Sequence, residues 1–172
     1  GITWTNKTQL CTVSDGYFNT YTAIGSLIKV GSTYYLYYVG RLEESTYIMR
    51  KSSSTLLGAY TGVPQNIDFP VVVGLDWYHL SVKYYNDKFY ILANTTSTTS
   101  KTVGDSIYIG VSDDGLHFQR PNTPLITKTE TVENKFYMPV FCTVGSKLFI
   151  YYSIKSNVNL WELMTAEMEI LQ

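Results

Sequence analysis

Cysteine and charged residues are both scarce in this chain of 172 residues. It has two cysteines, Cys11 and Cys142, and charged residues make up 16% of the sequence. Two thiols are too few for a disulfide scaffold and lack any metal-ligand spacing, so we expect neither a disulfide framework nor a metal site. The net charge is −1 and no cluster of Lys or Arg occurs, which argues against a nucleic-acid partner.

Long apolar runs are also missing. None approaches the roughly 18 to 20 residues that a membrane-spanning helix needs, so we expect no membrane insertion. Aromatic residues are abundant instead, with 16 Tyr, 7 Phe and 3 Trp. Such a composition favours strands over helices, and it predicts an all-β protein. We expect no cofactor.

A hairpin pattern recurs three times along the chain, at residues 28–38, 83–93 and 142–152. Each copy consists of two runs of aromatic and β-branched residues around a tight corner, Gly-Ser or Asn-Asp, which is typical of a β-hairpin. A third strand is expected after each hairpin, and a short fourth strand ending in an aromatic residue is expected after the first two. The third strands are predicted at 46–50, 106–111 and 160–165, and the fourth strands at 57–60 and 115–118.

The fourth strand of the last copy is expected from the other end of the chain. The aromatic residues Trp4, Tyr60 and Phe118 lie 56 and 58 residues apart, and the period continues from Phe118 through the C-terminus to Trp4. The pattern predicts one β-propeller-type domain over residues 1–172, with three four-stranded antiparallel blades. The blades are expected at 18–62, 75–120 and 134–169, with residues 1–5 completing the last. The alternative is a β-sandwich.

Three blades leave a propeller incomplete, because such rings typically have four to eight. The pattern leaves three alternatives open: two copies of the chain pair into one ring, the chain is part of a longer protein, or three blades close by themselves. An open ring would expose an aromatic blade face to water. We therefore expect an assembly, either a homo-oligomer or a longer chain that supplies further blades.

Two turn motifs carry a family resemblance. The segment 112–118, with the sequence SDDGLHF, resembles the Ser-x-Asp-Gly-x-x-aromatic turn of five-bladed glycosidase propellers. The segment 53–60, SSTLLGAY, resembles the corresponding turn of glycoside hydrolase family 43. In physical terms, an Asp or Ser caps a tight turn and Gly takes a positive φ. The resemblance implies a propeller fold and, at most, glycoside hydrolysis.

The resemblance also implies three catalytic carboxylates at the starts of successive blades. The candidates are Asp15, Asp76 and Glu133, if the chain is a hydrolase. The position where the family carries its acid, just before a Pro in the third blade, is occupied by Tyr137. Glycoside hydrolysis needs two carboxylates facing one bond, so the catalytic set is poorly filled.

A ligand is expected at one end of the blades. The loops that enter the first strand of each blade and those that join the second to the third strand share this end, and the latter are predicted to be long, at 40–45, 94–105 and 153–159. Aromatic rings with polar tips beside charged groups suit a sugar, although core packing is an equal alternative for each ring. The candidate ligand-binding residues are Tyr21, Arg41, Trp77, Tyr78, His79, Tyr137 and Lys155.

These features predict a non-catalytic module that binds a glycan or a glycosylated receptor. We expect it on a secreted or viral surface protein, resembling a tail fibre, and therefore outside the cell or on a virion. The alternative is a glycoside hydrolase of the family 43-like propeller type, or a fragment of one.

Overall fold

The computed structural model describes residues 10, 21–42, 45–58, 60, 63–98, 103–127, 133–145, 147–156 and 160–168. Every regular element within these ranges is a β-strand, so the prediction of an all-β protein is confirmed. No helix in these ranges is long and apolar enough to cross a membrane.

The strands form three antiparallel sheets that follow one another along the chain. The first contains β1 (Tyr21–Val30), β2 (Thr33–Leu42), β3 (Ser45–Ser53) and β4 (Gln65–Asn66). The second contains β5 (Leu75–Tyr85), β6 (Lys88–Ser97), β7 (Val103–Ser112) and β8 (Ile126–Thr127). The third contains β9 (Glu133–Val144), β10 (Lys147–Ser156) and β11 (Trp161–Met168).

Tight corners join the first two strands of each sheet, as the repeat predicted. Gly31 and Gly145 have φ values of +57° and +61°, and Asn86 and Asp87 have φ values of +46° and +57°. These left-handed conformations match the twist of an antiparallel hairpin and are tolerated best by Gly, Asn and Asp. The register that follows places equivalent residues of the three copies in equivalent positions.

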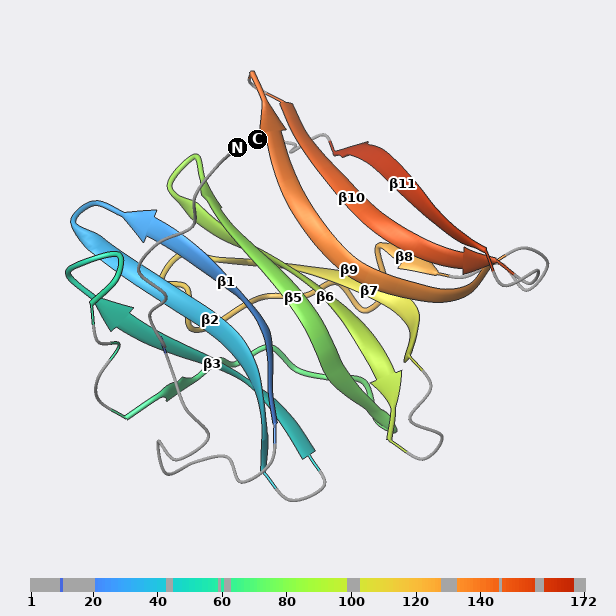
Figure 1. Cartoon of the computed structure of the whole chain (residues 1–172), viewed down its shortest axis with the longest axis horizontal. Coiled ribbons are helices and arrows are strands. Elements are labelled where there is room, and N and C mark those ends of the chain that lie inside the picture. The colour runs from blue at the N-terminus through green and yellow to red at the C-terminus, as the bar shows by residue number, and fades with distance from the viewer. Residues whose placement is uncertain are drawn as a thin grey trace, which may run out of the picture.

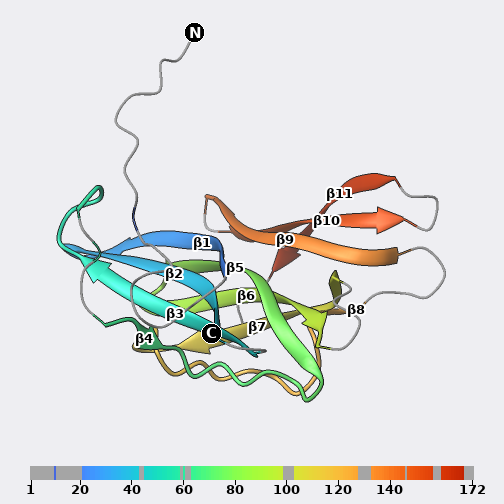
Figure 2. The same ribbon diagram turned by 60° about the horizontal axis from the view of Figure 1, so that its bottom comes forward.

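The three sheets stand side by side in chain order, like adjacent blades of a propeller (Figures 1 and 2). The first strands of the blades lie next to one another, because β5 packs against both β1 and β9. One hydrophobic core fills the space between the first and second sheets, and a second core fills the space between the second and third sheets. Where two sheets face each other, apolar side chains therefore line both of the facing surfaces.

The positions predicted for the fourth strands were wrong. The structure places β4 and β8 at residues 65–66 and 126–127, after the predicted segments 57–60 and 115–118. The second of those segments begins as a turn, because the Asp114 carboxylate accepts the backbone N–H groups of Leu116 and His117 at 2.8 and 2.9 Å. His117 then pairs with Asp68, and Gln119 pairs with Val111 of β7, each in an isolated bridge. Gly115 has a φ of +71°, which an extended strand does not allow.

The first predicted segment is also a turn. Thr55 donates its backbone N–H to the Ser53 hydroxyl at 3.2 Å, and the Gly58 N–H bonds to the Thr55 carbonyl at 3.3 Å. Capping of the turn by Ser, Asp and Gly thus follows the predicted chemistry even though the strand lies elsewhere.

In the described residues the third sheet has three strands. Residues 1–5, predicted to supply its fourth strand, lie outside the described residues, so this prediction is untested.

Candidate functional site

The strand register places equivalent residues of the three blades in one layer, at one end of the blades. Tyr21 pairs with Arg41 and Asp76 pairs with Thr96. Lys135 pairs with Lys155 in the third blade. The starts of β1, β5 and β9 therefore share one end of the molecule with the connections from the second to the third strands, and we call this the upper end.

Those connections are shorter than predicted. β2 ends at Leu42 and β3 begins at Ser45, so the first connection has only two residues outside strands. The second and third connections span 98–102 and 157–160. The strands extend further than the aromatic runs suggested, because polar residues such as Thr95 and Thr96 continue the ladder of β6. The described residues at this end belong mainly to strands.

Trp77, at the start of β5, belongs to the core between the first two blades. Its side chain is 3% exposed and stacks on Phe69 with ring centroids 4.6 Å apart. The indole N–H donates a hydrogen bond of 3.0 Å to the Phe69 carbonyl. This ring is held by packing on one face and by a hydrogen bond at its edge, which is the environment of a buried aromatic residue.

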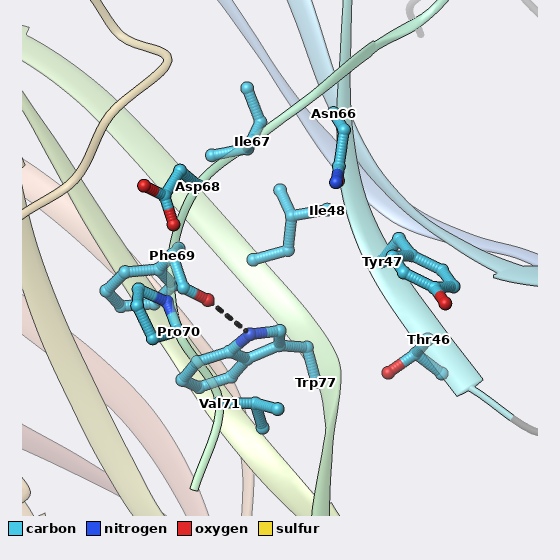
Figure 3. Close-up of a pocket in the computed structure, with 10 residues that line it drawn as sticks. All are labelled: Thr46, Tyr47, Ile48, Asn66, Ile67, Asp68, Phe69, Pro70, Val71 and Trp77. Atoms are coloured by element: carbon cyan, nitrogen blue, oxygen red, sulfur yellow. Dashed lines mark hydrogen bonds between the residues drawn. The ribbon is translucent and has the colours of Figure 1, made fainter.

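A pocket of about 380 Å³ lies beside Trp77. Figure 3 shows Thr46 and Tyr47 of β3 with Asn66 of β4 on one side of it, and the segment 68–71 with Trp77 on the other. Its polar groups come from Thr46, Asn66 and Asp68. The Thr46 hydroxyl is buried and has no hydrogen-bond partner among the described residues. The pocket therefore offers a few polar groups over an apolar floor at the junction of the first two blades.

Asp76 lies one residue before this ring, and its carboxylate joins the same two blades. The residue is buried, and its carboxylate accepts the backbone N–H of Thr46 at 3.4 Å. Asp15 and the side chain of Glu133 lie outside the described residues. The separation of two facing carboxylates, which would decide whether hydrolysis is feasible, is therefore known for none of the three pairs.

Four rings meet at the junction of the second and third blades. Tyr78 and His79 contact each other with centroids 4.0 Å apart, and Tyr137 on β9 contacts His79 at 4.4 Å and Tyr78 at 6.0 Å. Trp161 on β11 contacts Tyr137 at 5.6 Å. We call these four residues the aromatic cluster. Three of them were predicted as ligand residues, and the structure brings those three together.

His79 is fixed at the centre of the aromatic cluster. Its backbone N–H donates to the Asn94 side-chain oxygen at 2.9 Å, and the Asn94 amide donates to the Phe136 carbonyl at 3.1 Å. Burial lowers the pKa of the imidazole to about 4, so the ring is neutral near pH 7. Its Nδ1 atom is buried and has no hydrogen-bond partner among the described residues. The ring thus retains a polar atom that an incoming ligand or water could satisfy.

The phenol of Tyr137 has its pKa raised above the ordinary value, because it is desolvated and lies beside the Tyr78 phenol. The Tyr137 hydroxyl therefore stays protonated at neutral pH and can donate and accept hydrogen bonds. Lys155 and Arg41 are half-buried at the same end. The backbone of Tyr21 begins β1 there, but its side chain lies outside the described residues.

Trp161 is the member of the aromatic cluster that the sequence reasoning missed. It is 54% exposed, which makes it the most accessible ring of the four. A signal was present, because Trp161 begins the third strand of its blade directly opposite Lys155. In the part of the chain that the structure describes, no group of three or more His, Cys, Asp and Glu side chains is placed to hold a metal ion.

Solved structures with the same arrangement of strands identify the fold. The chain resembles an N-acetylgalactosamine deacetylase from F. plautii, solved in complex with blood group B trisaccharide, with a TM-score of 0.72 and 13% identity over 94% of this chain and 52% of that one. An α-L-arabinofuranosidase from Lactobacillus brevis matches with a TM-score of 0.62 and 14% identity, over 84% and 48% of the two chains. A thermostable family-43 glycoside hydrolase matches with a TM-score of 0.60 and 18% identity, over 89% and 51%.

The fold is that of a β-propeller, which this chain shares with the three structures. The identities lie below the level at which fold similarity carries activity, and the same fold here includes a deacetylase as well as glycoside hydrolases. The sequence matches no model of a protein family, and it matches no curated protein sequence.

The chain spans about half the length of these three structures. The chain therefore corresponds to only some of the blades of each matched protein, and not to the whole of it. The resemblance read from the blade turns is therefore supported for the fold, whereas the number of blades in the finished ring is not.

Proposed function

We propose that this chain binds carbohydrate at the upper end of its second and third blades, through the aromatic cluster, and does not cleave it. The module would act as a glycan- or receptor-binding part of a secreted or viral surface protein. The observation that carries the proposal is the meeting of Tyr78, His79, Tyr137 and Trp161 at one blade junction. The three matched structures support it, since the names of all three refer to carbohydrate or to its chemistry.

The cluster suits a sugar for two physical reasons. Ring faces stack on the C–H faces of a pyranose, and tyrosine hydroxyls exchange hydrogen bonds with its hydroxyl groups. Neutral His79 adds a polar atom without a charge, so an uncharged glycan is not penalised by a desolvated ion. The half-buried Lys155 pairs with Trp161 in the register of β10 and β11. Its ammonium group can donate a hydrogen bond to a sugar hydroxyl or form an ion pair with an acidic sugar.

The absence of cleavage is proposed from two positions. Tyr137 stands where the resembled family carries its acid, and its ring is engaged in the cluster. The carboxylate of Asp76 faces the first blade, where it accepts the backbone N–H of Thr46. A general acid must reach the glycosidic oxygen, whereas Tyr137 lacks the carboxyl group of the family's acid and the Asp76 carboxylate bonds to the first blade.

A glycan array followed by calorimetry on the strongest ligand tests the proposal. Tyr137→Ala and Tyr78→Ala should each weaken binding by roughly 1 to 3 kcal/mol, which corresponds to a dissociation constant raised about 5-fold to 150-fold. Tyr34→Ala is the matched control, because this half-buried tyrosine adjoins the Gly31 corner at the opposite end. Circular dichroism must show that all three variants fold. Failure to bind any glycan, or equal losses in all three variants, would contradict the proposal.

Glycoside hydrolysis is the second candidate, and the comparisons favour it, because two of the matched structures are named as glycoside-cleaving enzymes. The test is release of reducing sugar from arabinan, xylan, fructan or a sialoside. Turnover that disappears in Asp76→Asn and Glu133→Gln would establish hydrolysis and overturn the binding-only proposal. Glycan binding without turnover in the parent protein would exclude it for these substrates.

A further inference from the structure

The outward face of the third sheet carries exposed apolar side chains, one of them at a position that is buried in the other two blades. Ile48, Ile107 and Leu163 occupy the same position in the three blades, since they pair with the equivalent residues Val39, Asn94 and Ser153. Ile48 is 2% exposed and Ile107 is 0% exposed, because each is covered by the next blade. Leu163 is 73% exposed.

Other positions on this face agree. Val140 and Val144 are both exposed, as is Trp161 at the upper end. Phe149 and Tyr151 lie between them on the same face, because they pair with Cys142 and Val140 across β9 and β10. The face also carries the Lys147–Glu167 ion pair, because Lys147 pairs with Val144 and Glu167 pairs with Phe149. A group of exposed apolar residues with charged residues beside it is typical of a surface that binds another protein surface.

The opposite end of the arc is already covered. Leu36, Tyr38, Met49 and Tyr60 on the outer face of the first sheet are buried, and Leu10 and Tyr34 pack against them. In a head-to-tail contact, the third sheet of one copy would pack against this face of the next copy. Leu10 and Tyr34 of the same chain already pack there. Among the described residues, these central positions of the first sheet are closed to a neighbour, whereas Val140, Val144 and Leu163 on the third sheet are open to one.

We propose that two copies of this chain pair through the outward faces of their third sheets, about a two-fold axis. In a two-fold contact the same patch serves both partners, which fits a molecule with one open blade face. Two sheets packed face to face bury their inner side chains in a shared core about 10 Å thick. In the pair, the partner's sheet covers Leu163 in the same way that the next blade covers Ile48 and Ile107.

This proposal does not depend on carbohydrate binding. Trp161 lies where the open face meets the aromatic cluster, so replacing it would disturb both surfaces. Leu163 and Val144 belong to the face and not to the cluster, and they separate the two proposals.

The test is the solution mass of the chain, measured by light scattering and by analytical ultracentrifugation over a wide concentration range. The parent protein should reach twice the monomer mass of 19.5 kDa. Leu163→Lys and Val144→Lys should each raise the dimer dissociation constant by at least roughly tenfold, since a charge is then buried without a partner. Leu57→Lys is the control, because Leu57 is 57% exposed on the first blade and lies off this face.

A parent chain that stays monomeric at the highest concentration reached would overturn the proposal. A dimer that Leu57→Lys weakens as much as Leu163→Lys would place the contact elsewhere and would overturn it as well. Both Lys variants replace exposed residues, so they should keep the fold, and their circular dichroism checks this directly.

Discussion

The phenol of Tyr37 in β2 donates a buried hydrogen bond of 3.0 Å to the carbonyl oxygen of Gly115, which lies 78 residues further along the chain. Arg50 in β3 reaches the same turn, donating to the Asp114 carbonyl at 2.8 Å. The turn of the second blade is thus held by the middle strands of the first. Burial raises the pKa of Tyr37 to about 12, so this donor keeps its proton over the working pH range of most proteins.

Gly115→Ala should destabilise the protein through both backbone and packing. Gly115 has a φ of +71°, and a Cβ atom there would come within 2.4 Å of the Tyr37 hydroxyl and 2.9 Å of the Phe89 ring. Gly31→Ala is the matched control, because Gly31 has a φ of +57° with nothing within 4 Å of its Cβ position. We expect a loss of about 1 kcal/mol for Gly31→Ala and about 2 to 4 kcal/mol for Gly115→Ala in urea unfolding. Equal losses would show that Tyr37 moves aside without cost.

Ser81→Ala should weaken the contact between the second and third blades. The Ser81 hydroxyl accepts the buried backbone N–H of Phe141 at 3.2 Å, and Ser26 bonds in the same way to Val82 one blade earlier. Removal of the acceptor leaves a buried N–H unpaired, which costs about 1 to 3 kcal/mol. Denaturant unfolding measures the loss, and Ser52→Ala, at an exposed position outside the blade junctions, should change stability by less than about 0.5 kcal/mol. Equal effects would argue against a role for the Ser81 bond.

His79 should make stability depend on pH. Burial lowers its pKa in the folded chain to about 4, whereas an unfolded histidine titrates near 6.5. Between these values the unfolded state binds more protons, so stability is complete above about pH 6.5 and falls as the pH drops toward 4, by up to about 3 kcal/mol.

The measurement is the free energy of unfolding in urea at several pH values between about 7 and 4. His79→Gln should flatten the curve over this range while lowering its upper plateau. Parallel curves for the parent and the variant would show that another group causes the pH dependence.

Deletion of residues 1–5 should lower stability markedly if these residues complete the third blade. The expected reason is the loss of an entire strand from the sheet edge next to β11. The melting temperature of the truncated chain measures the effect, and a chain that melts at the parent temperature would refute closure by the N-terminus.

The sequence alone determined the repeat and its register. The offsets of 55 and 59 residues that align the hairpins also align the corners Gly31, Asn86 and Gly145 and the pairs Tyr21–Arg41, Asp76–Thr96 and Lys135–Lys155. These relationships are local, because a two-residue corner fixes which residues face each other along both strands. The fourth strands escaped the same reasoning, because each pairs over only two residues after a long turn.

Only the tertiary structure decided which side of a blade each site residue faces. Trp77 and Tyr78 are neighbours in β5, yet Trp77 packs toward the first blade and Tyr78 toward the third. Alternation along a strand predicts opposite faces for adjacent residues, but the register shift between Trp77 and His79 sets where the alternation breaks. Trp161 joined the aromatic cluster, and Leu163 remained exposed, for a related reason. Both outcomes depend on what packs against the third sheet. Packing between sheets involves residues far apart in the sequence, so the periodicity of a single strand cannot predict it.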